Sequence, residues 1–122
     1  MKTTYTYDHY YKYDEIKTIL ESFTEKYPDL IDLQVNCVTL EGRNQYVATL
    51  TNKKTGNALD KPGWYLDGNI HAGEVTASIC AMHMIDRFVV AEVVPHQVFI
   101  MGFNRFDPVV QHILCLFINR SA

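Results

Sequence analysis

Apolar side chains follow helical spacing in the segment from about Asp14 to Lys26. Residues three or four positions apart lie on one side of an α-helix, so this spacing gives the helix one apolar side. Pro28, which cannot continue a helix, follows two residues later. The segment therefore predicts an amphipathic helix, whose apolar residues are Ile16, Ile19, Leu20 and Phe23.

The next stretch alternates apolar with polar residues in two runs, which is the pattern of half-buried strands. The first run is Ile31, Leu33, Val35 and Cys37, and the second is Tyr46, Ala48 and Leu50. A turn sequence, Glu41-Gly42-Arg43, stands between them, so we expect the two strands to pair as a hairpin. A polar loop over residues 52–61 follows.

A short apolar strand and a second helix come next. The strand is Trp64–Asp67, directly after Pro62 and Gly63. The helix begins after His71, and its apolar stripe is Ala77, Cys80, Ala81, Met84, Ile85 and Phe88. From Val89 onward the chain is apolar without a clear period, so it predicts no further element. The residues that we expect to be structural are Leu20, Phe23, Trp64 and Ile85.

This alternation of strands and helices indicates the α/β class, and 122 residues suffice for one domain but not for two. The net charge of −3 gives no support to binding of nucleic acid or of an anionic membrane. No segment reaches the ~18 consecutive apolar residues that a membrane-spanning helix needs. The expected protein is therefore an ordinary globular domain.

The three cysteines, Cys37, Cys80 and Cys115, are widely spaced and form no Cys-x-x-Cys pair. This spacing favours buried thiols in a reducing compartment over a disulfide framework. The first seven residues lack the apolar core of a secretory signal. Together these features slightly favour the cytoplasm, but they leave the localisation unknown.

The richest motif joins the end of the strand to the start of the second helix: Gly68-Asn69-Ile70-His71-Ala72-Gly73-Glu74. A neutral imidazole and a carboxylate three residues apart can bind one metal ion, most often zinc. Sites of this kind lie just beyond the carboxyl ends of strands in α/β sheets. By itself a His-x-x-Glu pair is a weak signal, because it also occurs as a loop histidine beside a glutamate at a helix start.

Several motifs in the same order give the signal more weight. With Tyr13-Asp14-Glu15-Ile16 on the first helix, Glu-Gly-Arg at 41–43 and the motif at 68–74, the chain resembles the zinc metallocarboxypeptidases of the carboxypeptidase A-like family. The similarity covers roughly residues 9–90. On this basis we expect residues 1–122 to be the amino-terminal part of such a domain, with a divergent tail at 100–122.

The resemblance implies an incomplete form of a three-layer fold, in which a mixed sheet is flanked by helices. It also implies one catalytic zinc ion, with His71 and Glu74 as two of its three protein ligands and with peptides as the substrates. The family's third ligand, its general-base glutamate and the residues that hold the substrate's terminal carboxylate all lie beyond the length of this chain. The expected function is therefore that of a metallocarboxypeptidase, weakly active or inactive as this chain alone.

The departure from the family begins near residue 100, where Asn104-Arg105-Phe106-Asp107-Pro108 replaces the family's Pro-x-x-Asn-Pro-Asp-Gly pattern. A truncated or frame-shifted gene product is the simplest hypothesis. A sheet that ends there would keep an unpaired edge and leave Leu33, Val47 and Leu66 partly exposed, so the chain could self-associate through that edge.

Other candidate residues carry weaker signals. Arg43 is either a turn residue paired with a nearby acid, which we favour, or a contact to substrate at the edge of the cleft. Asn69 is expected to shape the backbone before His71. Nothing in the sequence places His96 or His112 near His71 as a further ligand.

Two alternative functions are a non-catalytic remnant or binding module, and a zinc deacylase of the aspartoacylase-like type.

Overall fold

The computed structural model describes residues 6, 8–71, 73–90 and 98–103. In this part of the chain two helices accompany four strands and two short 3-10 helices, at Lys53–Thr55 and Ala58–Asp60. The main elements, in chain order, are α1 (Tyr13–Lys26), β1 (Ile31–Val38), β2 (Asn44–Leu50), β3 (Gly63–Gly68), α2 (Val75–Val90) and β4 (Val98–Phe103). No helix in the described residues is both long enough and apolar enough to cross a membrane.

Helix α1 begins where the sequence places it. The Glu15 carboxylate accepts a hydrogen bond of 2.7 Å from the backbone N–H of Lys12, which satisfies one of the free donors at the helix start. At the other end the backbone N–H of Tyr27 donates to the carbonyl of Phe23, 2.8 Å away. Leu20 and Phe23 are fully buried, as predicted.

Strands β1 and β2 form the predicted antiparallel hairpin. Gly42 in its turn has a φ of +76°, a left-handed conformation that glycine adopts without steric cost. The three residues predicted to point inward from β2, Tyr46, Ala48 and Leu50, are all buried. On β1 the alternation is less regular because the register shifts between Val35 and Cys37, and Val35 is 51% exposed.

The four strands form one mixed sheet in the order β1-β2-β4-β3. Strand β4 pairs antiparallel with β2 and parallel with β3, so the last described strand lies between two earlier ones. No clear period of apolar residues predicted this strand. Within the described residues, β1 and β3 are the edges of the sheet.

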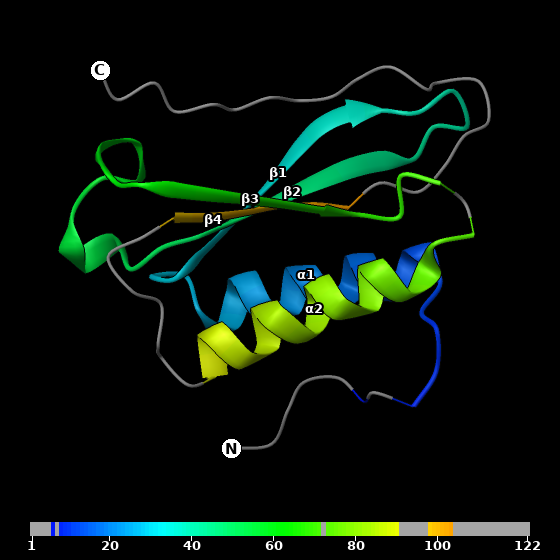
Figure 1. Ribbon diagram of the computed structural model, residues 1–122, viewed down its shortest axis with the longest axis horizontal. Helices are drawn as coiled ribbons and strands as arrows, with labels where there is room; N and C mark the ends of the chain where they lie inside the picture. The colour runs from blue at the N-terminus through cyan, green and yellow to red at the C-terminus, as the bar shows by residue number, and fades with distance from the viewer. Residues whose placement is uncertain (1–5, 7, 72, 91–97, 104–122) are drawn as a thin grey trace.

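Both helices lie on the same face of the sheet, as Figure 1 shows. The core lies between these two layers and includes Leu20 and Phe23 of α1, Leu50 of β2, and Met82 and Ile85 of α2. The described residues thus provide one helical layer and the mixed sheet of the expected α/β fold. The starts of both helices, the β1–β2 turn and the end of β3 all lie at one end of the sheet (Figure 1).

The expectation that Trp64 belongs to the core is wrong. Its side chain is 65% exposed, and its neighbours Tyr65 and Leu66 are 44% and 36% exposed. Successive side chains of a strand point to opposite faces, so exposure of three in a row reflects the edge position of β3. Leu33 and Val47 are also partly exposed, as expected.

The predicted stripe on α2 is also partly wrong. The buried side is made of Ser78, Ala81, Met82, Ile85, Asp86 and Val89, whereas Cys80 is exposed. This helix carries apolar residues nearly all round, so periodicity alone does not decide which side faces the sheet. Cys37 is partly buried and donates a hydrogen bond to the side-chain oxygen of Gln45, while Cys115 lies outside the described residues.

Candidate metal centre

The path from β3 to His71 is fixed by close packing against α2. A Cβ atom on Gly68, the last residue of β3, would lie 2.9 Å from the carbonyl carbon of Ala77. Only glycine lets the strand approach the helix backbone this closely. The strand end and the helix start are thereby held together, and the residues between them must turn within a short distance.

His71 and Glu74 meet at this turn. The Nδ1 atom of His71 lies 2.9 Å from Oε1 of Glu74, and the backbone N–H of His71 donates to Oε2 at 3.3 Å. In return the backbone N–H of Glu74 donates to the carbonyl of His71, 2.9 Å away. The two side chains therefore contact each other, and Glu74 directly precedes Val75, the first residue of α2.

The two side chains fit two ligand positions of a zinc ion. Donors that each lie about 2.1 Å from one zinc ion are about 3.4 Å apart at a tetrahedral angle. The observed distance of 2.9 Å between Nδ1 and Oε1 is about 0.5 Å shorter, a difference that a small side-chain rotation can supply. Both side chains are open to solvent, with 68% and 54% exposure, so an ion can reach them.

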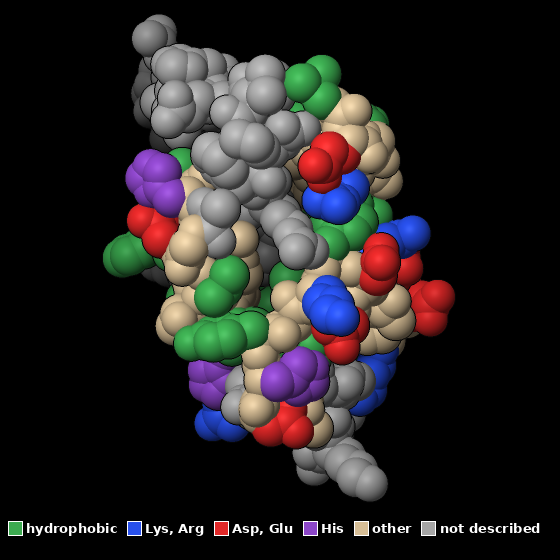
Figure 2. All heavy atoms as spheres, turned by 90° about the vertical axis from the view of Figure 1, so that its right-hand side faces the viewer, with side chains coloured by type: hydrophobic (Ala, Val, Ile, Leu, Met, Phe, Trp, Pro, Cys, Tyr) green, Lys and Arg blue, Asp and Glu red, His purple; other side chains and the backbone are tan. Residues whose placement is uncertain are grey.

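The electrostatics of the pair favour an ionised glutamate. The hydrogen bond from the His71 side chain, followed by the one from its backbone N–H, holds the pKa of Glu74 below its ordinary value. A carboxylate just before a helix is also favoured by the helix dipole. Figure 2 shows histidine and acidic side chains next to each other on this end of the molecule.

The amino-terminal residues contact the same region, which the sequence did not indicate. The hydroxyl groups of Tyr10 and Thr76 lie 3.1 Å apart, so the segment before α1 contacts the first turn of α2. His9 lies 2.7 Å from Asp8 and 3.5 Å from Glu15. These short-range ion pairs position the segment that leads into α1.

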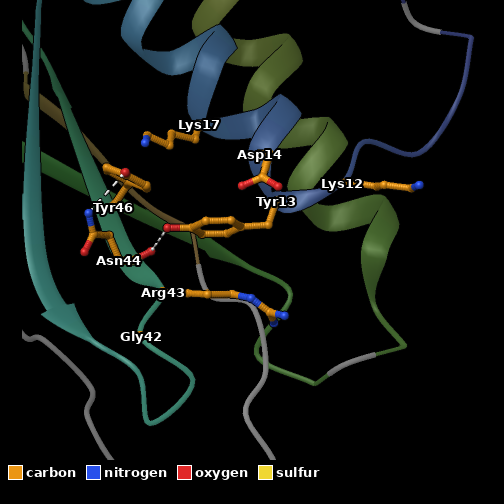
Figure 3. A pocket seen from close by; sticks show the side chains of 8 residues that line it. All are labelled: Lys12, Tyr13, Asp14, Lys17, Gly42, Arg43, Asn44 and Tyr46. Atoms are coloured by element: carbon orange, nitrogen blue, oxygen red, sulfur yellow. Dashed lines mark hydrogen bonds between the residues drawn. The ribbon is translucent and has the colours of Figure 1, made fainter.

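Arg43 lines a cavity of 460 Å³ between the start of α1 and the β1–β2 turn (Figure 3). Its guanidinium lies 2.5 Å from the carboxylate of Glu41, which is the turn pairing that we favoured. The Tyr13 hydroxyl donates to the carbonyl of Asn44 at 3.0 Å and so closes the inner wall. The other lining residues are Lys12, Asp14, Lys17, Gly42 and Tyr46.

Among the described residues no three histidine, cysteine, aspartate or glutamate side chains are grouped closely enough to bind a metal ion. His96 and His112, the weaker candidates for a further ligand, lie outside the described residues. His83 is exposed on α2. The described part of the site therefore consists of the His71–Glu74 pair.

Residues 16–95 match the sequence model of the zinc carboxypeptidases. This chain belongs to the zinc carboxypeptidase family. Carboxypeptidase B of Astacus astacus is 35% identical over 80 residues, which are 66% of this chain and 25% of that protein. Zinc carboxypeptidase A 1 of Drosophila melanogaster is 30% identical over 92 residues, which are 75% of this chain and 21% of that protein.

Solved structures show that the fold is that of a carboxypeptidase. Thrombin-activatable fibrinolysis inhibitor superposes with a TM-score of 0.69 at 21% identity, over 78% of this chain and 25% of that one. Carboxypeptidase A of Helicoverpa armigera gives a TM-score of 0.65 at 18% identity, over 79% and 24% respectively. The chain spans about a quarter of the length of these two solved structures and of the curated relatives.

Proposed function

We propose that this chain provides two zinc ligands, His71 and Glu74, of a metallocarboxypeptidase site that removes carboxy-terminal residues from peptides. The observation that supports this most directly is the 2.9 Å distance between Nδ1 of His71 and Oε1 of Glu74 at the end of β3. The family membership supplies the metal and the reaction class. It also favours a peptidase over the deacylase alternative.

When bound, zinc lowers the pKa of a coordinated water and polarises the scissile carbonyl. The role of this chain in that chemistry is to bind the ion from one side through His71 and Glu74. His71 can ligate only after Nδ1 has lost its proton, and Glu74 stays ionised because its pKa is lowered.

The proposed function also includes a contact to the substrate. Arg43 lies on the rim of the cavity at the same end of the sheet as the metal pair (Figures 1 and 3). We propose that it can leave Glu41 to contact a carboxylate of a bound peptide. Exposed pairs such as Arg43–Glu41 are worth little free energy, so the exchange would cost little.

Zinc titration and peptide hydrolysis test the proposal on the full chain. We expect measurable zinc binding that His71→Ala abolishes, with little or no release of carboxy-terminal residues, because two ligands without a general base do not complete the site. Zinc binding that survives the double replacement of His71 and Glu74 by alanine would place the metal elsewhere. Strong zinc-dependent turnover, lost in Glu74→Ala, would show that the chain is a competent peptidase.

A non-catalytic binding module is the second candidate function. It is supported by the exposed apolar row Trp64, Tyr65 and Leu66 on edge strand β3. Such a strand can pair with a strand of a second copy, so we propose self-association through β3. Trp64 is the chain's single tryptophan and lies on this strand, which makes the pairing directly measurable.

A further inference from the structure

Asn69 combines two unfavourable features two residues before His71. Its φ is +63°, in the left-handed region, which asparagine tolerates better than most residues but still adopts less easily than glycine. Its side chain is only 7% exposed, and its buried Oδ1 accepts no hydrogen bond within the described residues. Buried polar atoms are nearly always hydrogen-bonded, so neither feature is explained by the stability of the fold alone.

Unfavourable local conformations tend to gather where a site needs one particular geometry. We propose that Asn69 is a positioning residue: its left-handed backbone and buried side chain together hold His71 within reach of Glu74. This inference rests on the proposed zinc site and explains how the chain prepares it.

The packing around Asn69 shows why one position has this effect. Gly68 is held against Ala77, where a Cβ atom would come within 2.9 Å of the helix backbone. Glu74 is held by the start of α2, because the backbone N–H of Ala77 donates to its carbonyl at 3.0 Å. The chain must turn between these two fixed points, and the left-handed residue Asn69 makes that turn.

The buried side chain of Asn69 restricts the loop in a way that a glycine would not. Glycine adopts the left-handed backbone more easily, but directly after Gly68 it would leave two adjacent residues with wide conformational freedom. A buried asparagine restricts the rotation of its own backbone, and the side chain is confined by the surrounding structure. Asparagine at position 69 therefore restricts the loop to one conformation, although glycine there would give a more stable fold.

Two substitutions separate the contributions of backbone and side chain. Asn69→Gly keeps access to the left-handed backbone and removes the buried amide, whereas Asn69→Ala keeps a Cβ and disfavours the positive φ. We expect zinc affinity to fall about tenfold in both variants, as is typical when a residue behind a metal ligand is lost. The melting temperature of Asn69→Gly should stay equal or rise, because the buried unpaired oxygen is gone.

Asn57→Gly is the matched control, because Asn57 lies in the loop between β2 and β3, where its side-chain oxygen accepts a hydrogen bond from the backbone N–H of Leu59. It should leave zinc affinity unchanged. Wild-type zinc affinity in Asn69→Gly would overturn the role of the side chain. If zinc affinity falls only in variants whose melting temperature also falls, Asn69 acts through the stability of the fold and not by positioning His71.

A second measurement does not depend on zinc. The backbone N–H of Glu74 donates to the carbonyl of His71 at 2.9 Å, so its hydrogen exchange reports the order of the loop. We expect this amide to exchange faster in Asn69→Gly than in the wild type, because the loop has lost the restraint of the buried side chain. Unchanged exchange overturns the positioning role, even if the wild-type chain binds no zinc and the proposed function itself is wrong.

Discussion

Gly68 on β3 and Ala77 on α2 approach so closely that a Cβ atom on Gly68 would lie 2.9 Å from the carbonyl carbon of Ala77 and 3.0 Å from its oxygen. The obstacle is backbone and not the end of a flexible side chain. This contact sets the spacing between the strand that leads to His71 and the helix that follows Glu74, so the proposed metal pair depends on it.

We therefore expect Gly68→Ala to destabilise the fold by about 1–3 kcal/mol, the usual cost of overpacking. Thermal or urea unfolding measures it. Gly73→Ala is the control, because a Cβ there meets nothing within 4 Å and its φ lies outside the left-handed region. If Gly68→Ala and Gly73→Ala unfold at the same temperature or urea concentration, β3 does not approach α2 as closely as described.

Replacing His71 or Glu74 by alanine should abolish zinc binding and barely change the melting temperature. Both side chains are more than half exposed and lie outside the hydrophobic core. Zinc titration by calorimetry, with melting curves of the same samples, checks both parts. His83→Ala removes an exposed histidine from α2 and should bind zinc like the wild type. A large fall in melting temperature in Glu74→Ala would indicate a structural role instead.

Truncating a core residue should destabilise the fold much more than truncating Trp64. Leu20→Ala, Phe23→Ala and Ile85→Ala each empty a fully buried position and should cost about 2–5 kcal/mol. Trp64→Ala should cost less than any of them, because its side chain is 65% exposed. Unfolding in urea ranks the four variants, and a Trp64→Ala variant as unstable as Phe23→Ala would restore Trp64 to the core.

The segment before α1 should respond to pH through His9. The hydrogen bond to Asp8, with the further attraction of Asp8 and Glu15, raises the pKa of His9 above its ordinary value. A raised pKa means that protonated His9 stabilises the fold below about pH 6.5, and that this contribution is lost as the pH rises through the folded-state pKa.

We expect Asp8→Asn to lower the pKa of His9 toward its ordinary value, because the partner with the largest effect on His9 loses its charge. A proton NMR titration of the His9 ring follows this directly. Asp60→Asn is the control, since Asp60 lies in the short 3-10 helix Ala58–Asp60 after β2 and not in the segment before α1. An unchanged His9 titration in Asp8→Asn would rule out the pairing.

Self-association through β3 should be visible in the fluorescence of Trp64. Burial of an exposed indole shifts its emission to shorter wavelength, so the shift should grow with protein concentration and accompany a larger sedimentation coefficient. Leu66→Lys places a charge on the edge strand and should remove both effects. Leu40→Lys changes a leucine that is 72% exposed at the hairpin turn and should leave both intact. Equal loss in the two variants would indicate general solubility and not pairing through β3.

The sequence by itself determined the elements that depend on local pattern. Helical spacing and Pro28 delimited α1, alternation and Gly42 predicted the hairpin, and the motif around His71 indicated the family. Each of these signals depends on residues close together in the chain, where side-chain periodicity and turn preferences act directly.

Tertiary structure alone decided the features that depend on distant partners. The insertion of β4 between β2 and β3 places Trp64 on an edge, and contact with the sheet selects which side of the largely apolar α2 is buried. The 2.9 Å approach of His71 to Glu74 likewise depends on Gly68 packing against Ala77. Strand order and interlayer packing join residues far apart in the chain, and no local period encodes them.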